Sequence, residues 1–266
     1  MTDRARTTDT AVLRGEAYAD SSLLDDRRNI YAFREPPGDF TTWVLEAVPL
    51  DPGARLLDLG CGPGQYLEKV AATEPSVRMV GADLSLGMLR QARTAVPSAD
   101  VLSLDAARLP FADDSFDVVL ANHMLYHVAD IEAAVAEVRR VLRPGGLFSA
   151  VTNGVDHLVE LDRLLREQSG DDGWLRSAWR FSLENGRPFL ATAFDDITER
   201  RFAGELRVPS VEPVVRYIES MRALTGAWTG DRWAAIVDGA QQRVAEVIER
   251  EGRYTISTIA GAFVCR

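Results

Sequence analysis

The chain has 266 residues, of which 46% are hydrophobic and 26% charged, and these proportions indicate an ordinary globular protein and exclude fibrous and largely disordered classes. A formal net charge of −10 repels phosphate backbones, and no arginine-rich stripe with interleaved aromatics stands out, so a nucleic-acid substrate is disfavoured. No run of about 18 apolar residues occurs and residues 1–20 carry no apolar signal region, so we expect a cytoplasmic protein without a membrane span.

The cysteine and histidine contents argue against a disulfide framework and against a metal site. Cys61 and Cys265 are the two cysteines, their spacing is not that of metal ligands, and only three histidines are present. We therefore expect no metal.

The first 39 residues are predicted to form a tail followed by a lid segment. Residues 1–15 show no periodicity, short helical patterns follow over 16–30, and a Pro-Pro-Gly break at 36–38 requires a turn. Asp39 then precedes a helical pattern over residues 40–48 and is a candidate N-cap. Tyr18 and Tyr31 are candidate lid side chains.

Strand and helix patterns alternate from residue 54 onward, which is typical of βα units around a parallel sheet. The predicted strands are 55–59, 78–83, 100–104, 116–121 and 146–152. The predicted helices are 65–73, 86–96 and 131–142. Residues 40–154 are therefore the predicted ligand-binding core.

The alternation loosens beyond residue 154, where helices over 155–168, 211–224 and 231–250 and strands over 196–206 and 254–265 are predicted. No low-complexity linker separates this half from the first. We therefore interpret residues 155–266 as an insertion that determines specificity for the substrate that accepts the transferred group, followed by final strands that complete the same sheet. Four of the five tryptophans lie here, and we expect them to wall an apolar pocket, with core packing as the alternative. They are Trp174, Trp179, Trp228 and Trp233.

The sequence L-L-D-L-G-C-G-P-G at residues 56–64 predicts a buried strand that ends in a tight turn before a helix. In an open α/β sheet a ligand lies across the carboxyl ends of the strands, so Asp83, Asp105 and Asn122, each at a strand end, should join the turn at one site. Asp83 lies 19 residues after Gly64, the distance expected of a carboxylate that accepts hydrogen bonds from ribose hydroxyls.

The glycine spacing discriminates between two nucleotide ligands. A dinucleotide site needs G-x-G-x-x-G so that the pyrophosphate can sit at the helix N-terminus, but the spacing here is G-x-G-x-G. Asp58, two residues before the first glycine, would repel a pyrophosphate and would suit a ligand that carries an ammonium and a sulfonium cation.

Four motifs occur in matching order between residues 54 and 152: L-D-L-G-C-G-P-G, G-A-D-L-S-L-G-M-L, D-A-A-R-L-P-F-A-D-D-S-F-D-V-V and E-V-R-R-V-L-R-P-G-G. With them the chain resembles the class I S-adenosylmethionine-dependent methyltransferases, and within these the branch of ubiquinone/menaquinone biosynthesis and natural-product tailoring. The resemblance implies an α/β fold: a Rossmann-like, doubly wound, seven-stranded, mainly parallel sheet with an antiparallel last strand, plus a helical cap.

The resemblance also implies S-adenosyl-L-methionine as the cofactor and a set of residues that bind it. The methionyl part would contact Asp58, Gly60, Cys61 and Gly62. The ribose would bind Asp83, the adenine would lie between Leu84 and Met88 and bond to Asp105 and Ala106, and the sulfonium end would face Asn122 and His123.

The methyl acceptor is less constrained by sequence. His127, with His123 four residues before it on a possible shared helical face, is the preferred candidate for a catalytic base, and His157 is a third histidine to consider. Arg34 could bind the methionyl carboxylate or be solvated. We expect methyl transfer to O, N or C of a small, partly apolar molecule, with secondary metabolism as one setting. A nicotinamide-dependent oxidoreductase, a non-catalytic cofactor-binding protein and a tRNA-modifying methyltransferase stay open as alternatives, as does the oligomeric state.

Overall fold

A computed structural model describes residues 8–170, 180–225, 228 and 230–266, and its centre is one eight-stranded sheet in the order β1-β7-β8-β6-β5-β2-β3-β4. The strands are β1 (Arg34–Glu35), β2 (Arg55–Leu59), β3 (Arg78–Ala82), β4 (Asp100–Leu102), β5 (Phe116–Asn122), β6 (Leu142–Asn153), β7 (Ile197–Val208) and β8 (Tyr254–Cys265). Strands β4, β3, β2, β5 and β6 pair in parallel, whereas β8 is antiparallel to both β6 and β7.

The mainly parallel sheet and the antiparallel last strand confirm the expected fold class, but the sheet has eight strands and not seven. The additional strand is β1, whose two residues pair antiparallel with Glu205 and Leu206 of β7. A strand of two residues contains no alternation of apolar and polar positions, so the sequence pattern could not reveal it.

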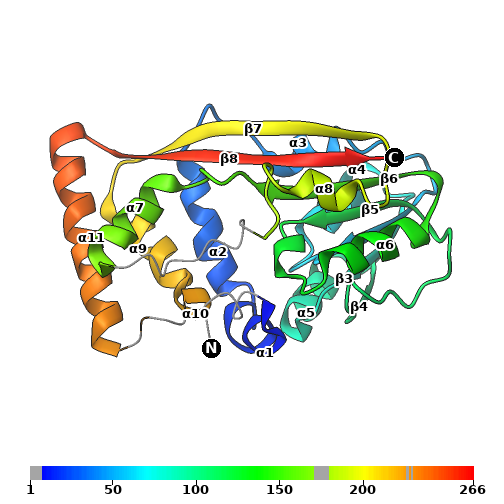
Figure 1. The fold of residues 1–266 in the computed structure, drawn as a ribbon, viewed down its shortest axis with the longest axis horizontal. Coiled ribbons are helices and arrows are strands. Elements are labelled where there is room, and N and C mark those ends of the chain that lie inside the picture. Colours follow the sequence, from blue (N-terminus) through cyan, green and yellow to red (C-terminus); the bar gives the residue numbers. More distant parts are fainter. Residues whose placement is uncertain (1–7, 171–179, 226–227, 229) are drawn as a thin grey trace.

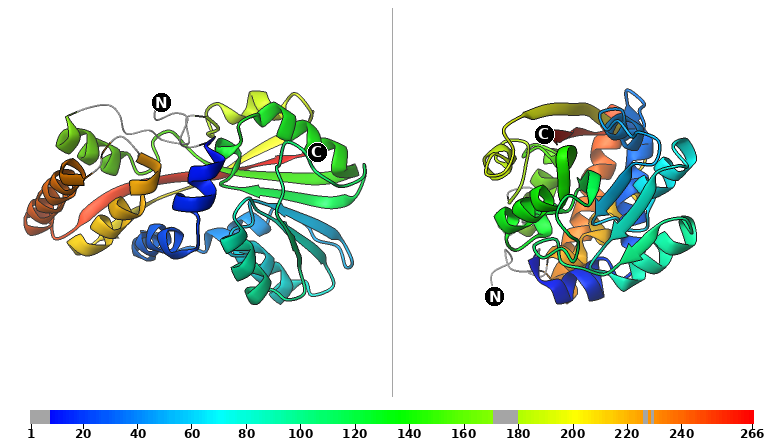
Figure 2. Two further views of the ribbon diagram at one scale, coloured as in Figure 1. Left: turned by 90° about the horizontal axis from the view of Figure 1, so that it is seen from below. Right: turned by 90° about the vertical axis from the view of Figure 1, so that its right-hand side faces the viewer.

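Helices cover both faces of the parallel half of the sheet. The helix α6 (Ile131–Val141) packs into the apolar cluster on one face. The cluster on the opposite face takes α3 (Phe40–Leu45), α4 (Gln65–Thr73) and α5 (Leu86–Ala95). Figure 2 shows this layering in its right-hand, end-on view. The carboxyl ends of the parallel strands are thereby left at one edge, where a ligand can reach them.

The strands β7 and β8 continue past the end of β6 and connect the sheet to a second group of helices. The two strands pair over 12 residues each, but only the second half of β8 also pairs with β6. The extension packs with α7 (Val159–Ser169), α9 (Val211–Ser220) and α11 (Gly230–Glu251) around a separate apolar cluster. Figure 1 shows β7 and β8 running from the sheet to these helices, which we call the helical lobe.

The N-terminal segment lies between the sheet and the helical lobe (Figure 1). It consists of α1 (Thr10–Val12), a π-helical turn (Leu13–Ala17), α2 (Ser22–Asn29) and a 3₁₀ turn (Ile30–Phe33). The helix α2 packs against α9, and the preceding turn packs against α10 (Arg222–Thr225).

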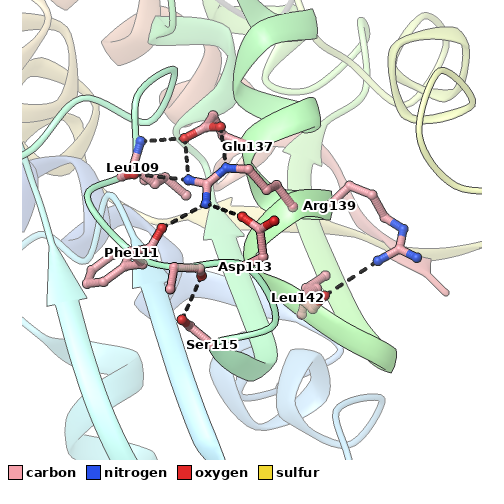
Figure 3. A network of polar contacts seen from close by, with 9 residues as sticks. Leu109, Phe111, Asp113, Ser115, Glu137, Arg139 and Leu142 are labelled. Carbon is pink, nitrogen blue, oxygen red and sulfur yellow. Dashed lines mark hydrogen bonds and ion pairs between the residues drawn. The ribbon is translucent and has the colours of Figure 1, made fainter.

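An arginine-centred network fixes the loop that follows β4. Arg140 on α6 pairs with Glu137 at 2.7 Å and with Asp113 at 2.9 Å, and it also donates to the carbonyl oxygens of Leu109 and Phe111. Glu137 in turn accepts the backbone N–H of Leu109 at 2.7 Å (Figure 3). The loop is therefore clamped to α6, and the segment just before it, which carries two candidate site residues, has a fixed anchor.

The predicted boundaries differ from the observed ones in both halves, and β6 begins at Leu142 instead of the predicted residue 146. The predicted helix at 155–168 begins only at Val159, because Leu158 has a left-handed φ of 57°. The short helix α8 (Gly186–Leu190) was not predicted from the sequence. No helix among the described residues is long and apolar enough to cross a membrane.

The expectation that the tryptophans wall a pocket is wrong for the two that the structure describes. Trp228 and Trp233 are 1% and 2% exposed and stack on one another in the core of the helical lobe. Helix packing requires their bulk there, so the packing alternative holds. Trp174 and Trp179 lie outside the described residues.

Candidate active site

The glycine turn follows β2 with a backbone that glycine adopts readily. Gly60, Gly62 and Gly64 have φ values of 68°, 55° and 96°. A Cβ atom at Gly60 would lie 2.6 Å from the Cβ of Met124, so a larger residue would not fit even without a ligand. The turn therefore presents bare backbone at the carboxyl edge of the sheet.

Asp83, directly after β3, connects the turn to the neighbouring strand. Its Oδ2 accepts the N–H of Gly62 at 3.0 Å, and its Oδ1 accepts the N–H of Ser85 at 2.8 Å. Burial raises the pKa of this carboxyl, and the backbone N–H groups oppose the shift. Asp83 thus shapes the turn as well as offering lone pairs to a ligand.

Two buried polar side chains beneath the turn, Asp58 and Asn122, lie beside one another but form no hydrogen bond of ordinary geometry with the described residues. Both carboxylate oxygens of Asp58 and both polar atoms of the Asn122 amide lack hydrogen bonds. Burial and then the charge of Asp83 raise the pKa of Asp58 to about 8, partly offset by Asn122. Orphaned buried polar groups are uncommon in native proteins, and a ligand with an ammonium group could bond to Asn122 and be attracted by the charge of Asp58, which lies buried behind it. The residues present therefore fit the methionyl end of S-adenosylmethionine.

A cavity of about 720 Å³ lies against this edge of the sheet. Eleven of the twelve sequence-predicted site residues line it: Gly60, Cys61, Gly62, Asp83, Leu84, Met88, Asp105, Ala106, Asn122, His123 and His127. Asp58 does not line it and lies fully buried behind the wall. Asp105 is exposed and its carboxylate also accepts the N–H of Ala107 at 2.9 Å, so it caps its own turn.

The N-terminal segment closes over the cavity at the start of α5. Ser85 Oγ donates to the carbonyl oxygen of Tyr18 at 2.6 Å, and Gln91 donates to Ser21 at 3.2 Å. A Cβ atom at Gly87 would lie 1.7 Å from the carbonyl oxygen of Ala19, so only glycine permits this approach. The sequence offered no motif for this contact, because it joins positions almost 70 residues apart.

The two candidate histidines do not share a helical face. His123 directly follows β5 and has a left-handed φ of 54°, which prevents a helix there, and His127 closes the 3₁₀ turn Leu125–His127. Burial lowers the pKa of His123 to about 4, so its ring is neutral at pH 7. The Nε2 atom of His127 lies 3.1 Å from the hydroxyl of Tyr18, and the two rings meet edge to face at 5.5 Å.

The third histidine pairs with the other lid tyrosine. His157 Nε2 lies 2.7 Å from the hydroxyl of Tyr31, and both residues line the cavity. Tyr66, Tyr126 and Tyr217 also line it, so that five of the six tyrosines of the chain face one cavity. Sequence reasoning missed the last three, and their clustering is visible only in three dimensions.

Comparisons with known proteins support the interpretation of this cavity as the site of a methyltransferase. Residues 57–150 match the model of a methyltransferase domain. The malonyl-[acyl-carrier protein] O-methyltransferase of Methylococcus capsulatus is 33% identical over 178 residues, which are 65% of this chain and 63% of that protein. The demethylmenaquinone methyltransferase of Renibacterium salmoninarum is 38% identical over 128 residues, 46% of this chain and 53% of that protein. The chain thus spans less than two thirds of the length of these curated relatives.

A solved structure shares the fold at low sequence identity. It is phosphoethanolamine N-methyltransferase 2 of Haemonchus contortus, in complex with phosphomonomethylethanolamine and S-adenosylhomocysteine. The TM-score is 0.60 at 18% identity, covering 98% of this chain and 60% of that one. Fold, motifs and matching domain together define a Rossmann-like methyltransferase domain. Residues 57–150 thus form a methyltransferase domain of the class I type, whose cofactor is S-adenosylmethionine, and the chain is similar to S-adenosylmethionine-dependent methyltransferases.

Proposed function

We propose that this protein transfers the methyl group of S-adenosylmethionine to an O, N or C atom of a small molecule. The observation that carries the proposal is the continuity of the cavity: one space is bounded by the glycine turn at one end and by Tyr31, His157 and Tyr217 at the other. Donor and acceptor can therefore lie end to end, as an in-line displacement at the methyl carbon requires.

The cofactor would be held by the residues of the three strand ends. We assign the ribose hydroxyls to Asp83, the methionyl ammonium to Asn122 with the charge of Asp58 behind it, and the adenine to Leu84, Met88, Asp105 and Ala106. The glycine turn would let the cofactor approach the backbone. When bound, the cofactor supplies an electrophilic methyl group on a sulfonium.

We assign proton removal to the pair of Tyr18 and His127. Burial raises the pKa of Tyr18, so its phenol is protonated at pH 7 and can donate to His127 Nε2 at 3.1 Å. The Tyr18 oxygen can then accept a proton from the acceptor while its own proton moves to His127. His123, with a pKa of about 4, is a weak base and is assigned to the wall beside the cofactor.

The location of the protein, the class of acceptor and the roles of the three segments are also part of the proposal. We propose a cytoplasmic location, and we expect small molecules and not nucleic acids as acceptors, since the net charge of −10 opposes phosphate backbones. The N-terminal residues 1–39 are proposed to act as tail and lid, residues 40–154 as the cofactor core, and residues 155–266 to supply acceptor specificity.

Calorimetric titration of the full chain tests the proposal. S-adenosylmethionine and S-adenosylhomocysteine should bind saturably at micromolar concentration, whereas NAD should not. Incubation with methyl-labelled cofactor and a broad acceptor panel should then transfer label to a small molecule. Saturable binding of NAD with none of S-adenosylmethionine would contradict the proposal, and cofactor binding without any turnover would favour a non-catalytic protein.

A further inference from the structure

The lining of the cavity carries buried positive charge that no carboxylate among the described residues neutralises. Arg27 and Arg34 both line the cavity and are each 9% exposed. Neither forms an ion pair with a carboxylate in the described part of the chain. Burying a charge without a counter-charge is costly, so this arrangement calls for a physical explanation.

Arg34 is held rigidly by neutral groups. Its Nη1 donates to Thr258 Oγ1 at 2.7 Å, its Nη2 donates to the carbonyl oxygen of Ala203 at 2.8 Å, and its Nε has no partner. The guanidinium carbon lies 3.9 Å from the centre of the Phe202 ring. Two of its five donors are therefore used, and the planar group is positioned with its charge intact.

The carboxylates that lie nearest to Arg34 in the β1–β7 pairing bind other arginines. Alternate residues of a strand face opposite sides of a sheet, so Glu35 points away from the side that Arg34 faces. Glu35 and Glu205, which oppose one another across β1 and β7, both pair with Arg207. Arg200 on the same strand β7 has Glu46 within 3.9 Å. Within the part of the chain that the structure describes, the absence of a carboxylate beside Arg34 is thus a local exception on an edge where other arginines are paired.

Arg34 is badly placed for the methionyl carboxylate of the cofactor. Its guanidinium reaches β8 at Thr258, and β6 and β5 separate β8 from the glycine turn on β2, a separation of roughly 14 Å at the usual strand spacing. Arg28 is the better candidate, because it lines the cavity and interacts electrostatically with Tyr66 and His123 beside the turn.

Tyr31 adds a second donor beside Arg34. The backbone N–H of Ile259 donates to His157 Nδ1 at 3.0 Å, so the neutral ring carries its proton on Nε2 and donates it to the Tyr31 oxygen at 2.7 Å. The hydroxyl hydrogen of Tyr31 has no acceptor among the described residues and remains available for a ligand. A donor of this kind next to a guanidinium complements an oxyanion.

We propose that the methyl acceptor is an anion whose carboxylate or phosphate group binds the Arg34 guanidinium and the Tyr31 hydroxyl. This assignment rests on the proposed methyl transfer and names the substrate class of the same cavity. The anion would fix one end of the acceptor, so that the nucleophilic atom at the other end faces the pair of Tyr18 and His127. The positive charge of Arg34 is opposite in sign to the net charge of −10. This contrast favours a specific binding site for an anion in the cavity.

The test compares three small probes on the full chain saturated with S-adenosylhomocysteine. Benzoate and phenyl phosphate carry the two candidate anions, and benzamide is the neutral match of benzoate. We expect dissociation constants, measured by ligand-observed NMR titration, to be at least tenfold lower for one anion than for benzamide. The tighter of the two anions identifies the group as carboxylate or phosphate.

Two Arg34 variants and one matched control assign the preference to this site. Arg34→Gln should reduce the tenfold ratio to within about twofold, and Arg34→Lys should keep only part of it, because an ammonium lacks the planar fork. Arg200→Gln, an arginine of β7 outside the cavity, should leave the ratio unchanged. Unchanged affinity for S-adenosylhomocysteine shows that each variant is folded, and if Arg34→Gln fails this check, Arg34→Lys decides.

Three outcomes would overturn the assignment: benzamide binding as tightly as both anions, no binding of any probe while S-adenosylhomocysteine binds, or a ratio that survives the Arg34 substitutions. Failure of the wild-type chain to bind S-adenosylhomocysteine at all would instead contradict the proposed methyl transfer.

Discussion

The two ends of the cavity are constructed on different principles. At the donor end the glycine turn, Asp83, Asp105 and Asn122 come from strand ends within fewer than 70 residues of chain, and parallel pairing alone brings them to one edge. The acceptor end combines the N-terminal segment, the helical lobe and the extension of β7 and β8. The proposed donor site thus depends on local strand ends and the proposed acceptor site on long-range packing, so changes at the two ends should separate cofactor affinity from turnover.

The sharpest separation is expected at Tyr18, which belongs to the acceptor end. Tyr18→Phe keeps the ring but removes the hydroxyl that lies 3.1 Å from His127 Nε2. We expect kcat to fall roughly 100-fold, within the range of general acid–base effects, while the affinity for S-adenosylhomocysteine stays unchanged. Steady-state kinetics with an acceptor of the wild-type enzyme measures the first, and calorimetry the second.

His127→Ala completes a double-mutant cycle with Tyr18→Phe. If the two residues act as a unit, the double variant should be no slower than the slower single variant. Tyr254→Phe is the matched control, since Tyr254 lies outside the cavity and donates to a backbone carbonyl. Additive losses, or wild-type turnover in either single variant, would remove the pair from catalysis.

Asp83→Ala should act at the donor end. The change removes charge-assisted hydrogen bonds to the ribose, worth about 1.5–3 kcal/mol, and releases the N–H of Gly62 that shapes the turn. We expect the dissociation constant of S-adenosylhomocysteine to rise roughly 10- to 100-fold by calorimetry. Asp105→Ala should have a smaller effect because its carboxylate is exposed. An unchanged dissociation constant for Asp83→Ala would refute the ribose assignment.

The same contrast explains how far the sequence could be interpreted. β2 and α4 were predicted with their observed bounds, because apolar runs and turn residues are local signals. The lining residues Gly60, Asp83 and Asn122 followed from their places at strand ends. The pairing of Tyr31 with His157 could not be predicted from the sequence, because the two residues lie 126 positions apart. The His157 ring is also held by the backbone of Ile259 on β8, which is a third distant segment.

Gly87→Ala would test the lid, where the two ends meet. The added methyl group would lie 1.7 Å from the carbonyl oxygen of Ala19, so the N-terminal segment must move away from α5. We expect faster proteolysis within residues 10–33 and a several-fold weaker affinity for S-adenosylhomocysteine.

Gly15→Ala is the matched control for the lid, because an added methyl group there has no neighbour within 4 Å. Limited proteolysis followed by mass spectrometry measures the cleavage rates of both variants. Equal protection of Gly87→Ala and the wild-type chain would show that this contact does not hold the segment.

The last expected effect is a change in the number of protons bound at Asp58. Its pKa of about 8 lies above the value near 3.9 of an unfolded chain, so the folded protein holds a proton that the unfolded chain releases. Stability without cofactor should therefore fall as the pH rises from about 4 to about 8. A methionyl ammonium favours the carboxylate form, so cofactor binding at pH 7 should expel up to one proton. Calorimetry in phosphate and Tris buffers, which differ in protonation enthalpy, measures the number of protons released.

Asp58→Asn is the control variant, because asparagine has nearly the same shape as aspartate and no charge. This variant should abolish the proton release and flatten the dependence of stability on pH. The raised pKa of Asp83 leaves a residual contribution that is common to both proteins. Equal proton release by the wild-type chain and Asp58→Asn would place the ammonium elsewhere at the donor end.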